Sequence, residues 1–249
     1  MPRYFLEVSY KGTHYSGSQK QKNANSIQAE IEKAFTILQK SSVVLTGSSR
    51  TDAGVHALQN FFHFDYNGKI NQHFAYKMNA ILPEDIVIKK IIPVHENANC
   101  RFDAVSREYK YFVYQDKNPF LKDSAYYYPY KLNLDLLKKG ALILKEYEDF
   151  ASFSKRNTQS KTSICDILES EWKIESNSLI YYVKANRFLR GMVRALVGTL
   201  LLVGREKISI KEFRKIIESK DCSKANFASP AHGLFLVSVN FPEDYFKPQ

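Results

Sequence analysis

Residues 47–57 read GSSRTDAGVHA and lie between two apolar segments, residues 43–46 (VVLT) and 58–65 (LQNFFHFD). The flanking segments are rich in the β-branched and aromatic residues that are typical of strands. The stretch between them is small and polar, with one arginine and one carboxylate, Arg50 and Asp52. The sequence therefore predicts a strand, a loop that presents Asp52, and a second strand.

Two interpretations of this loop fit its residues. An aspartate two residues before a glycine often folds a turn through hydrogen bonds to the nearby backbone. A carboxylate on a rigid loop, with Arg50 two residues away to keep it ionised, also has the properties of a nucleophile or a general base. Both interpretations of Asp52 stay open at this point.

The N-terminal part of the chain has the pattern of a strand, a loop and a helix. Apolar residues alternate over residues 4–10, as they do in a half-buried strand. Residues 11–25 have no periodicity, which predicts an exposed loop. From Ile27 the apolar residues recur at helical spacing, and Asn25 or Ser26 is available as the N-cap.

A second series of strands and helices begins with residues 107–114 (REYKYFVY), where Tyr109 belongs to an alternating pattern. We place the domain boundary just before this strand. The further predicted elements are a helix at 133–147, a strand at 179–186, an apolar helix at 188–203, a helix opened by a capping box of Ser209 and Glu212, and a strand at 234–241. The predicted fold class is α+β, with two similar domains, residues 1–104 and 105–249.

The composition is that of a folded, basic protein. In 249 residues, Lys and Arg total 36 and Asp and Glu total 26, which gives a formal net charge of +10. Hydrophobic residues make up 44% of the chain, far more than a disordered polyelectrolyte contains. The basic surplus favours an acidic partner, either phosphate-rich nucleic acid or an anionic membrane surface.

Neither a membrane span nor a cofactor site is predicted. The longest apolar stretch, residues 188–203, contains two arginines and is shorter than the roughly 18 to 20 apolar residues that cross a bilayer. The three cysteines form no CxxC pair, the six histidines are scattered, and glycine-rich phosphate-binding motifs do not occur. The chain starts without the pattern of a signal peptide. We therefore expect a cytoplasmic protein that uses no metal and no cofactor.

Five segments, in order along the chain, resemble motifs of the tRNA pseudouridine synthase A family. The most specific is RTDAGVHA at residues 50–57. The others are YxGTxYxGxQ at 10–19 with SIQ at 26–28, CRFDA at 100–104 with REYKY at 107–111, FLRGMVR at 188–194 with VGTL at 197–200, and PAHGL at 230–234. Together they extend along nearly the whole chain.

The resemblance implies roles for individual residues. It makes Asp52 the catalytic carboxylate and Tyr109 the aromatic residue that meets the target uracil. It also gives Asp52 two cationic companions, Arg50 and Arg194, of which Arg194 is the expected salt-bridge partner. A guanidinium beside a carboxylate offsets the desolvation of its charge in a dry pocket.

The reaction of that family explains why these residue types are needed. Uridine becomes pseudouridine when the N1–C1′ glycosidic bond breaks, the base turns, and a C5–C1′ bond forms. A carboxylate can attack C1′ as a nucleophile, or it can remove a sugar proton to give a glycal intermediate, and both routes stay open. An aromatic ring such as that of Tyr109 can stack on the uracil once it leaves the RNA stack.

Basic residues in the second half are expected to contact the RNA backbone. Arg187, Arg190 and Arg194 fall at i, i+3 and i+7 of the predicted apolar helix, so they would share one stripe. The polar loop at residues 152–163 adds Lys155, Arg156 and Lys161. The alternatives are a solvated helix face for the arginines and an ordinary surface loop for the other cations.

Four positions depart from the family pattern. Ser18 stands where a tryptophan is usual, Ser48 and Ser49 where Ala-Gly is usual, and Ala195 where asparagine is common. Ser49 would be strained if its position requires a positive φ. We expect these departures to affect RNA docking and the choice of uridine more than the reaction, since none replaces a residue assigned to catalysis.

The resemblance also implies an architecture and a substrate. It predicts two α/β domains, each an antiparallel sheet flanked by helices, with the active site in a basic cleft between them. Family members act as homodimers on uridines 38, 39 and 40 of the tRNA anticodon stem-loop, without a cofactor. Two other interpretations stay open, a non-catalytic RNA-binding or chaperone protein and a pseudouridine synthase that acts on another RNA. A hydrolase with paired carboxylates is disfavoured because Asp52 has no acidic counterpart in a comparable loop.

Overall fold

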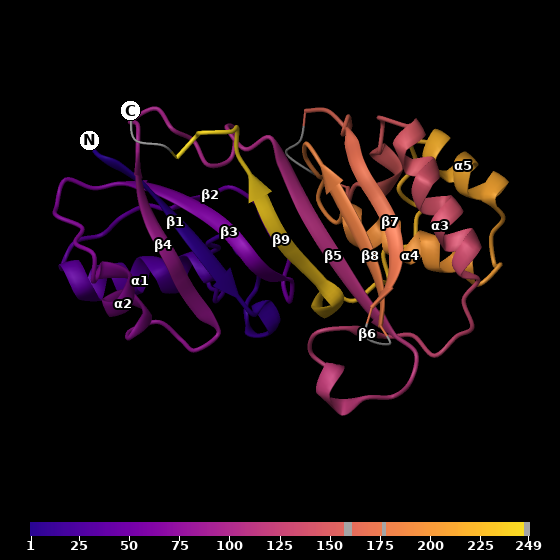
Figure 1. The fold of residues 1–249 in the computed structure, drawn as a ribbon, viewed down its shortest axis with the longest axis horizontal. Coiled ribbons are helices and arrows are strands. Elements are labelled where there is room, and N and C mark those ends of the chain that lie inside the picture. The colour runs from indigo at the N-terminus through magenta and orange to yellow at the C-terminus, as the bar shows by residue number, and fades with distance from the viewer. Residues whose placement is uncertain (157–160, 176–177, 247–249) are drawn as a thin grey trace. The chain divides into compact units, whose positions relative to one another are not determined.

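The computed structural model describes residues 1–156, 161–175 and 178–246, in which the chain forms two compact units (Figure 1). The first unit is Met1–Val105 together with the chain from Leu236 onward, and the second is Ser106–Phe235. Each unit contains strands and helices, so the predicted α+β class is confirmed.

The sheet of the first unit has the order β4-β1-β3-β9. Its strands are β1 (Arg3–Tyr10), β3 (His56–Asp65), β4 (Ile86–Val94) and β9 (Leu234–Asn240), and the short β2 (Thr46–Gly47) pairs with β3. β1 is antiparallel to both β3 and β4. The strands predicted at 4–10, 58–65 and 234–241 are confirmed, whereas only Thr46 of residues 43–46 belongs to a strand.

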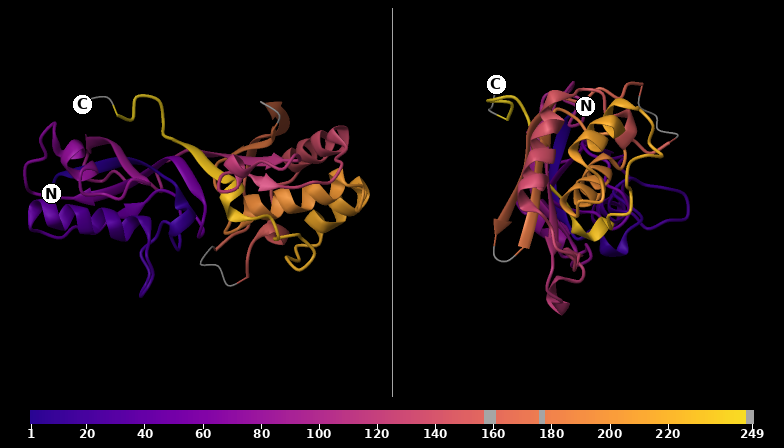
Figure 2. Two further views of the ribbon diagram at one scale, coloured as in Figure 1. Left: turned by 90° about the horizontal axis from the view of Figure 1, so that it is seen from below. Right: turned by 90° about the vertical axis from the view of Figure 1, so that its right-hand side faces the viewer.

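Two helices, α1 (Ile27–Gln39) and α2 (Phe74–Asn79), lie on one face of this sheet (Figures 1 and 2). The Ser26 hydroxyl accepts a hydrogen bond from the Ala29 amide at the start of α1, which confirms the predicted N-cap. Phe35 of α1 packs edge-on against Phe64 of β3, with ring centroids 5.4 Å apart. Burying rings of this size stabilises the fold by about 2 kcal/mol each.

The opposite face of the sheet is covered by aromatic residues that follow β9. Phe5 of β1 and Phe61 of β3 both contact Phe241, with ring centroids 5.7 and 5.2 Å apart. Phe246 lies 6.0 Å from the same two rings. Because side chains alternate along a strand, the neighbours Phe61 and Phe62 are both buried, one on each face.

The sheet of the second unit has the order β5-β8-β7. Its antiparallel strands are β5 (Ser106–Tyr114), β7 (Ile167–Glu175) and β8 (Ser178–Ala185), and the short β6 (Tyr126–Tyr127) is parallel to β5. Tyr111, Tyr181 and Trp172 lie side by side across the three strands, and all are fully buried. The pattern of the sequence did not predict β7, whereas β5 and β8 are confirmed.

The helices of the second unit are α3 (Leu134–Ile143), α4 (Met192–Gly204) and α5 (Ile210–Glu218), which pack against one another (Figure 1). The capping box of Ser209 and Glu212 opens α5 as predicted. Single 3-10 turns are found at η1 (Gly12–His14), η2 (Pro119–Leu121), η3 (Leu144–Glu146), η4 (Ala151–Phe153) and η5 (Ala231–Gly233). Within the described residues, no helix has the length and apolarity needed to cross a membrane.

The predicted helix at 188–203 starts later than expected. α4 begins at Met192, and Gly191 before it has a φ of +75°, a left-handed conformation that the interior of a helix does not allow. Arg187 and Arg190 therefore precede the helix, and only Arg194 lies on it. The predicted stripe of three arginines along one helix is wrong.

Candidate active site

The Asp52 loop is a turn between β2 and β3. The Val55 amide donates a hydrogen bond to the Asp52 carbonyl at 3.2 Å, and Gly54 has a φ of +78°. The side chain of Asp52 is half-buried and that of Arg50 is exposed, whereas Thr51 between them is buried. The residues therefore do form a turn, and this turn leaves the carboxylate within reach of a ligand.

A second loop, residues 11–25, packs against the Asp52 loop. The Ser18 amide donates to the Thr51 carbonyl at 3.1 Å, and the Gly54 amide donates to the Tyr15 carbonyl at 3.3 Å. At the base of the turn, the Gly12 amide donates to His56 Nδ1 at 3.0 Å. The Asp52 loop is thus fixed by backbone hydrogen bonds to a segment some 40 residues earlier in the chain.

Buried polar side chains form a network under the same loop. The Ser18 hydroxyl accepts from the Thr51 amide at 2.9 Å and donates to the Ser49 carbonyl at 3.4 Å. The amide of Asn60 on β3 donates to the Ser49 carbonyl at 3.1 Å and to the Tyr10 hydroxyl at 3.0 Å. Tyr10 and Thr51 share a further hydrogen bond of 2.9 Å between their hydroxyls. Burial raises the pKa of Tyr10, which keeps its hydroxyl protonated.

Three of the four departures from the family pattern lie in this network. Ser18, Ser48 and Ser49 are all buried, and the Ser48 hydroxyl donates to Asn60 Oδ1 at 2.8 Å. Ser49 is not among the described residues with a positive φ, so the condition under which it would be strained is not met. The sequence did not indicate the roles of Tyr10 and Asn60, although an asparagine inside a phenylalanine-rich strand is a signal of a buried polar contact.

Tyr109 lies on β5 in the second unit. Its side chain is buried and meets the ring of Phe188 edge-on, with centroids 5.1 Å apart. Tyr111, two residues further along the strand, is fully buried and donates from its hydroxyl to the Pro230 carbonyl at 2.8 Å. Tyr111 is therefore a core residue, whereas Tyr109 lies beside the segment that carries Arg187.

The cations of the second unit fall into two groups. Arg194 lies in the first turn of α4, and its Nε donates to the Ser229 carbonyl at 2.7 Å. Lys155 and Arg190 are neighbours, because the Lys155 amide donates to the Arg190 carbonyl at 3.0 Å. The side chain of Lys155 runs past Gly191, where a β-carbon would lie 3.1 Å from it.

Arg156 has a partner within the protein. A hydrogen bond to the Cys222 side chain raises the pKa of this exposed arginine. Lys161 is also exposed, and residues 157–160 of the same loop lie outside the described part of the chain.

The predicted site residues divide between the two units. Arg50 and Asp52 belong to the first unit. The six others belong to the second unit, and they are Tyr109, Lys155, Arg156, Arg187, Arg190 and Arg194.

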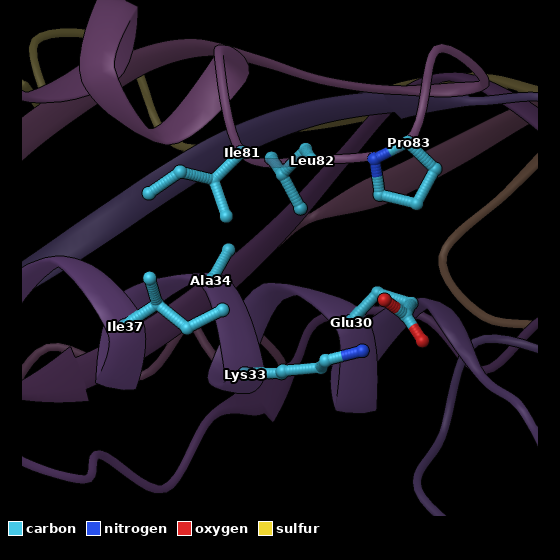
Figure 3. Close-up of a pocket in the computed structure, with 7 residues that line it drawn as sticks. All are labelled: Glu30, Lys33, Ala34, Ile37, Ile81, Leu82 and Pro83. Carbon is cyan, nitrogen blue, oxygen red and sulfur yellow. The ribbon is translucent and has the colours of Figure 1, made fainter.

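Two hollows in the first unit involve other residues. One of about 280 Å³ lies between α1 and the loop after α2, with Ala34 and Ile37 opposite Ile81 and Leu82 (Figure 3). Another of about 400 Å³ lies along the sheet beside Phe61. No predicted site residue lines either of them. The described residues also contain no group of three or more His, Cys, Asp or Glu side chains placed to hold a metal ion.

Comparison with known proteins places the chain in a family. The model of the tRNA pseudouridine synthase family matches residues 7–103 and 147–242. The tRNA pseudouridine synthase A of Azobacteroides pseudotrichonymphae is 43% identical over 248 residues, which cover 99% of this chain and 100% of that protein. The enzyme of the same name from Parabacteroides distasonis is 44% identical over 99% of this chain and 98% of its own length. That of Bacillus subtilis is 36% identical over 94% and 97%. The chain belongs to the tRNA pseudouridine synthase A family.

Proposed function

We propose that Asp52 is the catalytic carboxylate with which this protein, a tRNA pseudouridine synthase and hence an isomerase, converts uridine to pseudouridine in tRNA. Full-length similarity to synthases of this name supports the reaction. The observation that carries the residue assignment is the setting of Asp52, a half-buried carboxylate on a loop whose neighbouring peptide groups are fixed by buried partners.

The reaction needs a carboxylate but no external reagent. The N1–C1′ bond breaks and a C5–C1′ bond forms, while C5 loses a proton and N1 gains one, so the atoms balance. Asp52 either attacks C1′ or takes a proton from the sugar to give the glycal. In both routes an ionised carboxylate held in one orientation lowers the barrier, because its position is set before the substrate arrives.

The other catalytic assignments are part of the same proposal. Arg50 and Arg194 are the cationic companions of Asp52, and Tyr109 stacks on the extruded uracil. The edge-on contact between Tyr109 and Phe188 supports an aromatic setting for the base. The position of Arg194 in the first turn of an otherwise apolar, buried helix supports a specific role for its charge.

The remaining cations are proposed to bind the RNA backbone. The backbones of Lys155 and Arg190 are joined by a hydrogen bond, and Arg187 lies three residues before Arg190. The formal net charge of +10 supports an electrostatic contribution to RNA binding. Arg156 is exposed and belongs to the same proposed set.

Finer features are proposed from the resemblance. They are two similar domains that divide near residue 105, with the chain from Leu236 onward returning to the first, and whose sheets flank a basic cleft. They also include a homodimer in the cytoplasm and action on uridines 38, 39 and 40 of the anticodon stem-loop. The extent of the similarity to the named synthases supports them, since it covers nearly the whole length of both chains.

The test is release of tritium from tRNA transcripts labelled at uridine C5, since the new glycosidic bond displaces that atom. We expect the wild-type protein to release tritium and the Asp52→Asn variant to bind the same tRNA without releasing any. Asp116→Asn, which neutralises an exposed carboxylate after β5, is the matched control and should release tritium at the wild-type rate. Turnover by Asp52→Asn would remove Asp52 from its role, and binding without release by the wild type would favour a non-catalytic RNA-binding protein.

A further inference from the structure

Ser18 contacts both peptide groups of Thr51, the residue between Arg50 and Asp52. Its hydroxyl accepts from the Thr51 amide at 2.9 Å, and its own amide donates to the Thr51 carbonyl at 3.1 Å. The same hydroxyl donates to the Ser49 carbonyl at 3.4 Å. Ser18 therefore holds three consecutive peptide groups, which are Ser49–Arg50, Arg50–Thr51 and Thr51–Asp52.

The loop depends on these contacts because it has little regular structure of its own. Residues 50–52 belong to no strand or helix, and Thr51 is buried. A buried peptide group without a partner destabilises a conformation, so a loop of this kind takes the shape its partners dictate. Ser18 is itself only 2% exposed, which leaves its side chain little freedom to turn away.

A second support holds Thr51 from its side chain. The Tyr10 hydroxyl bonds to Thr51 Oγ1 and accepts from Asn60, and Asn60 also donates to the Ser49 carbonyl. Tyr10 lies on β1 and Asn60 on β3, which are paired strands. The network therefore connects the loop to two paired strands of the first unit, and Ser18 is the member that contacts the loop backbone most.

We infer that Ser18 is a positioning residue for catalysis, which sets the direction of the Asp52 carboxylate through Thr51. The inference rests on the proposed role of Asp52. Ser18 acts on the backbone and makes no contact with substrate in this scheme. Its loss is expected to change the rate of the chemical step, because a small displacement of a reacting group has a large effect on rate.

Ser49 offers a matched control for Ser18. Both serines are buried on the same network, but no described residue bonds to the Ser49 hydroxyl. Its carbonyl is the group that the network uses, and this group remains in an alanine variant. Ser18→Ala and Ser49→Ala thus remove the same atom from neighbouring buried sites, and only the first removes hydrogen bonds to the loop.

The experiment compares kcat and KM for tritium release from labelled tRNA. For Ser18→Ala we expect kcat to fall about tenfold, with KM and tRNA affinity within about twofold of the wild type. Ser49→Ala should keep kcat within about twofold. Active enzyme is normalised by tRNA-binding titration, so that a merely unstable fraction does not lower the apparent kcat. Ser18→Cys, which keeps a weaker donor and acceptor of similar size, should give an intermediate kcat and replaces Ser18→Ala if that variant does not fold.

Three results would overturn the inference: a wild-type kcat in the folded Ser18 variant, an equal loss in Ser49→Ala, or a change confined to KM. The Asp52→Asn variant separates this inference from the proposed function. If Asp52→Asn is inactive and Ser18→Ala is fully active, only the role of Ser18 is wrong. If Asp52→Asn turns over normally, the role of Asp52 itself is wrong.

Discussion

Gly17 stands so close to Thr51 that a β-carbon on Gly17 would lie 2.8 Å from the Thr51 carbonyl oxygen. Gly17 also has a φ of +104°, which side chains other than hydrogen rarely allow. We expect Gly17→Ala to push the two loops apart. It should lower the free energy of unfolding by about 1 to 3 kcal/mol and reduce tritium release more than tenfold.

Denaturant unfolding and steady-state turnover check this expectation. Ser16→Ala is the control, because Ser16 is an exposed neighbour with an ordinary φ. Equal stability and equal turnover of the Gly17 and Ser16 variants would show that the approach of the two loops has no role in either property.

Tyr109 and Tyr111 should respond differently to substitution, although they share one face of β5. Tyr109→Leu should lower kcat more than tenfold, whereas Tyr109→Phe should keep most of it, since stacking on a base requires the ring and not the hydroxyl. Tyr111→Phe should leave turnover unchanged and lower the free energy of unfolding by about 1 kcal/mol, because it loses the hydrogen bond to Pro230. Turnover and thermal unfolding measured on all three variants test the contrast, which fails if Tyr109→Leu is as active as Tyr111→Phe.

The salt dependence of tRNA binding should identify the phosphate contacts. If Lys155 and Arg190 each neutralise one phosphate, Lys155→Ala and Arg190→Ala should each make the slope of log K against log salt shallower by about 0.7 to 0.9. Lys138→Ala, which removes an exposed charge from α3, should change the slope little. Filter-binding titrations at several salt concentrations give the slopes, and parallel lines for all four proteins would contradict the assignment.

The Arg3–Asp65 pair gives the first unit a pH-dependent stability. The guanidinium contacts both carboxylate oxygens, at 2.7 and 2.8 Å, and its hydrogen bond lowers the pKa of Asp65. Because the folded pKa is depressed, the stabilisation is complete above the ordinary carboxyl pKa of 3.8 and is lost as the pH falls through the lower folded value. At neutral pH Asp65→Asn should be less stable by no more than about 1 kcal/mol, since the pair is partly exposed. Unfolding curves of the two proteins should converge in acid, and a constant difference down to that range would contradict the pairing.

Thiol reactivity should distinguish the three cysteines. Cys100 and Cys165 are fully buried, and burial raises the pKa of Cys165 to about 11, whereas Cys222 is half-buried. A disulfide reagent at about pH 8 should therefore label one thiol rapidly in the native protein and three after unfolding. Cys222→Ser should abolish the rapid phase, and rapid labelling of two thiols would show that one of the buried sites opens.

Local sequence signals predicted much of the fold and the turn that carries Asp52. The N-cap at Ser26 and the capping box at Ser209 are determined by residues within one turn of the chain, and both are confirmed. The conformation of Gly191 could not be predicted, because glycine occurs both inside helices and at their ends, and it displaced Arg187 and Arg190 from α4.

The support of the Asp52 loop could not be predicted for a different reason. Ser18 and Thr51 are 33 residues apart, and their contact depends on how two loops meet in three dimensions. The sequence marked Ser18, Ser48 and Ser49 only as unusual residues. Their common surroundings, and the positions of Tyr10 and Asn60 among them, are a property of the tertiary structure.

The return of the chain to its first unit sets the order in which the protein is completed during translation. β9 adds the last strand to the sheet of the first unit, and Phe241 covers Phe5 and Phe61. A ribosome makes the whole of Ser106–Phe235 before it reaches these residues, which at about 5 to 20 residues per second takes on the order of ten seconds. The unit that carries Asp52 is thus begun before the second unit and completed after it, and a nascent chain exposes the aromatic face of its first sheet until Phe241 has been made.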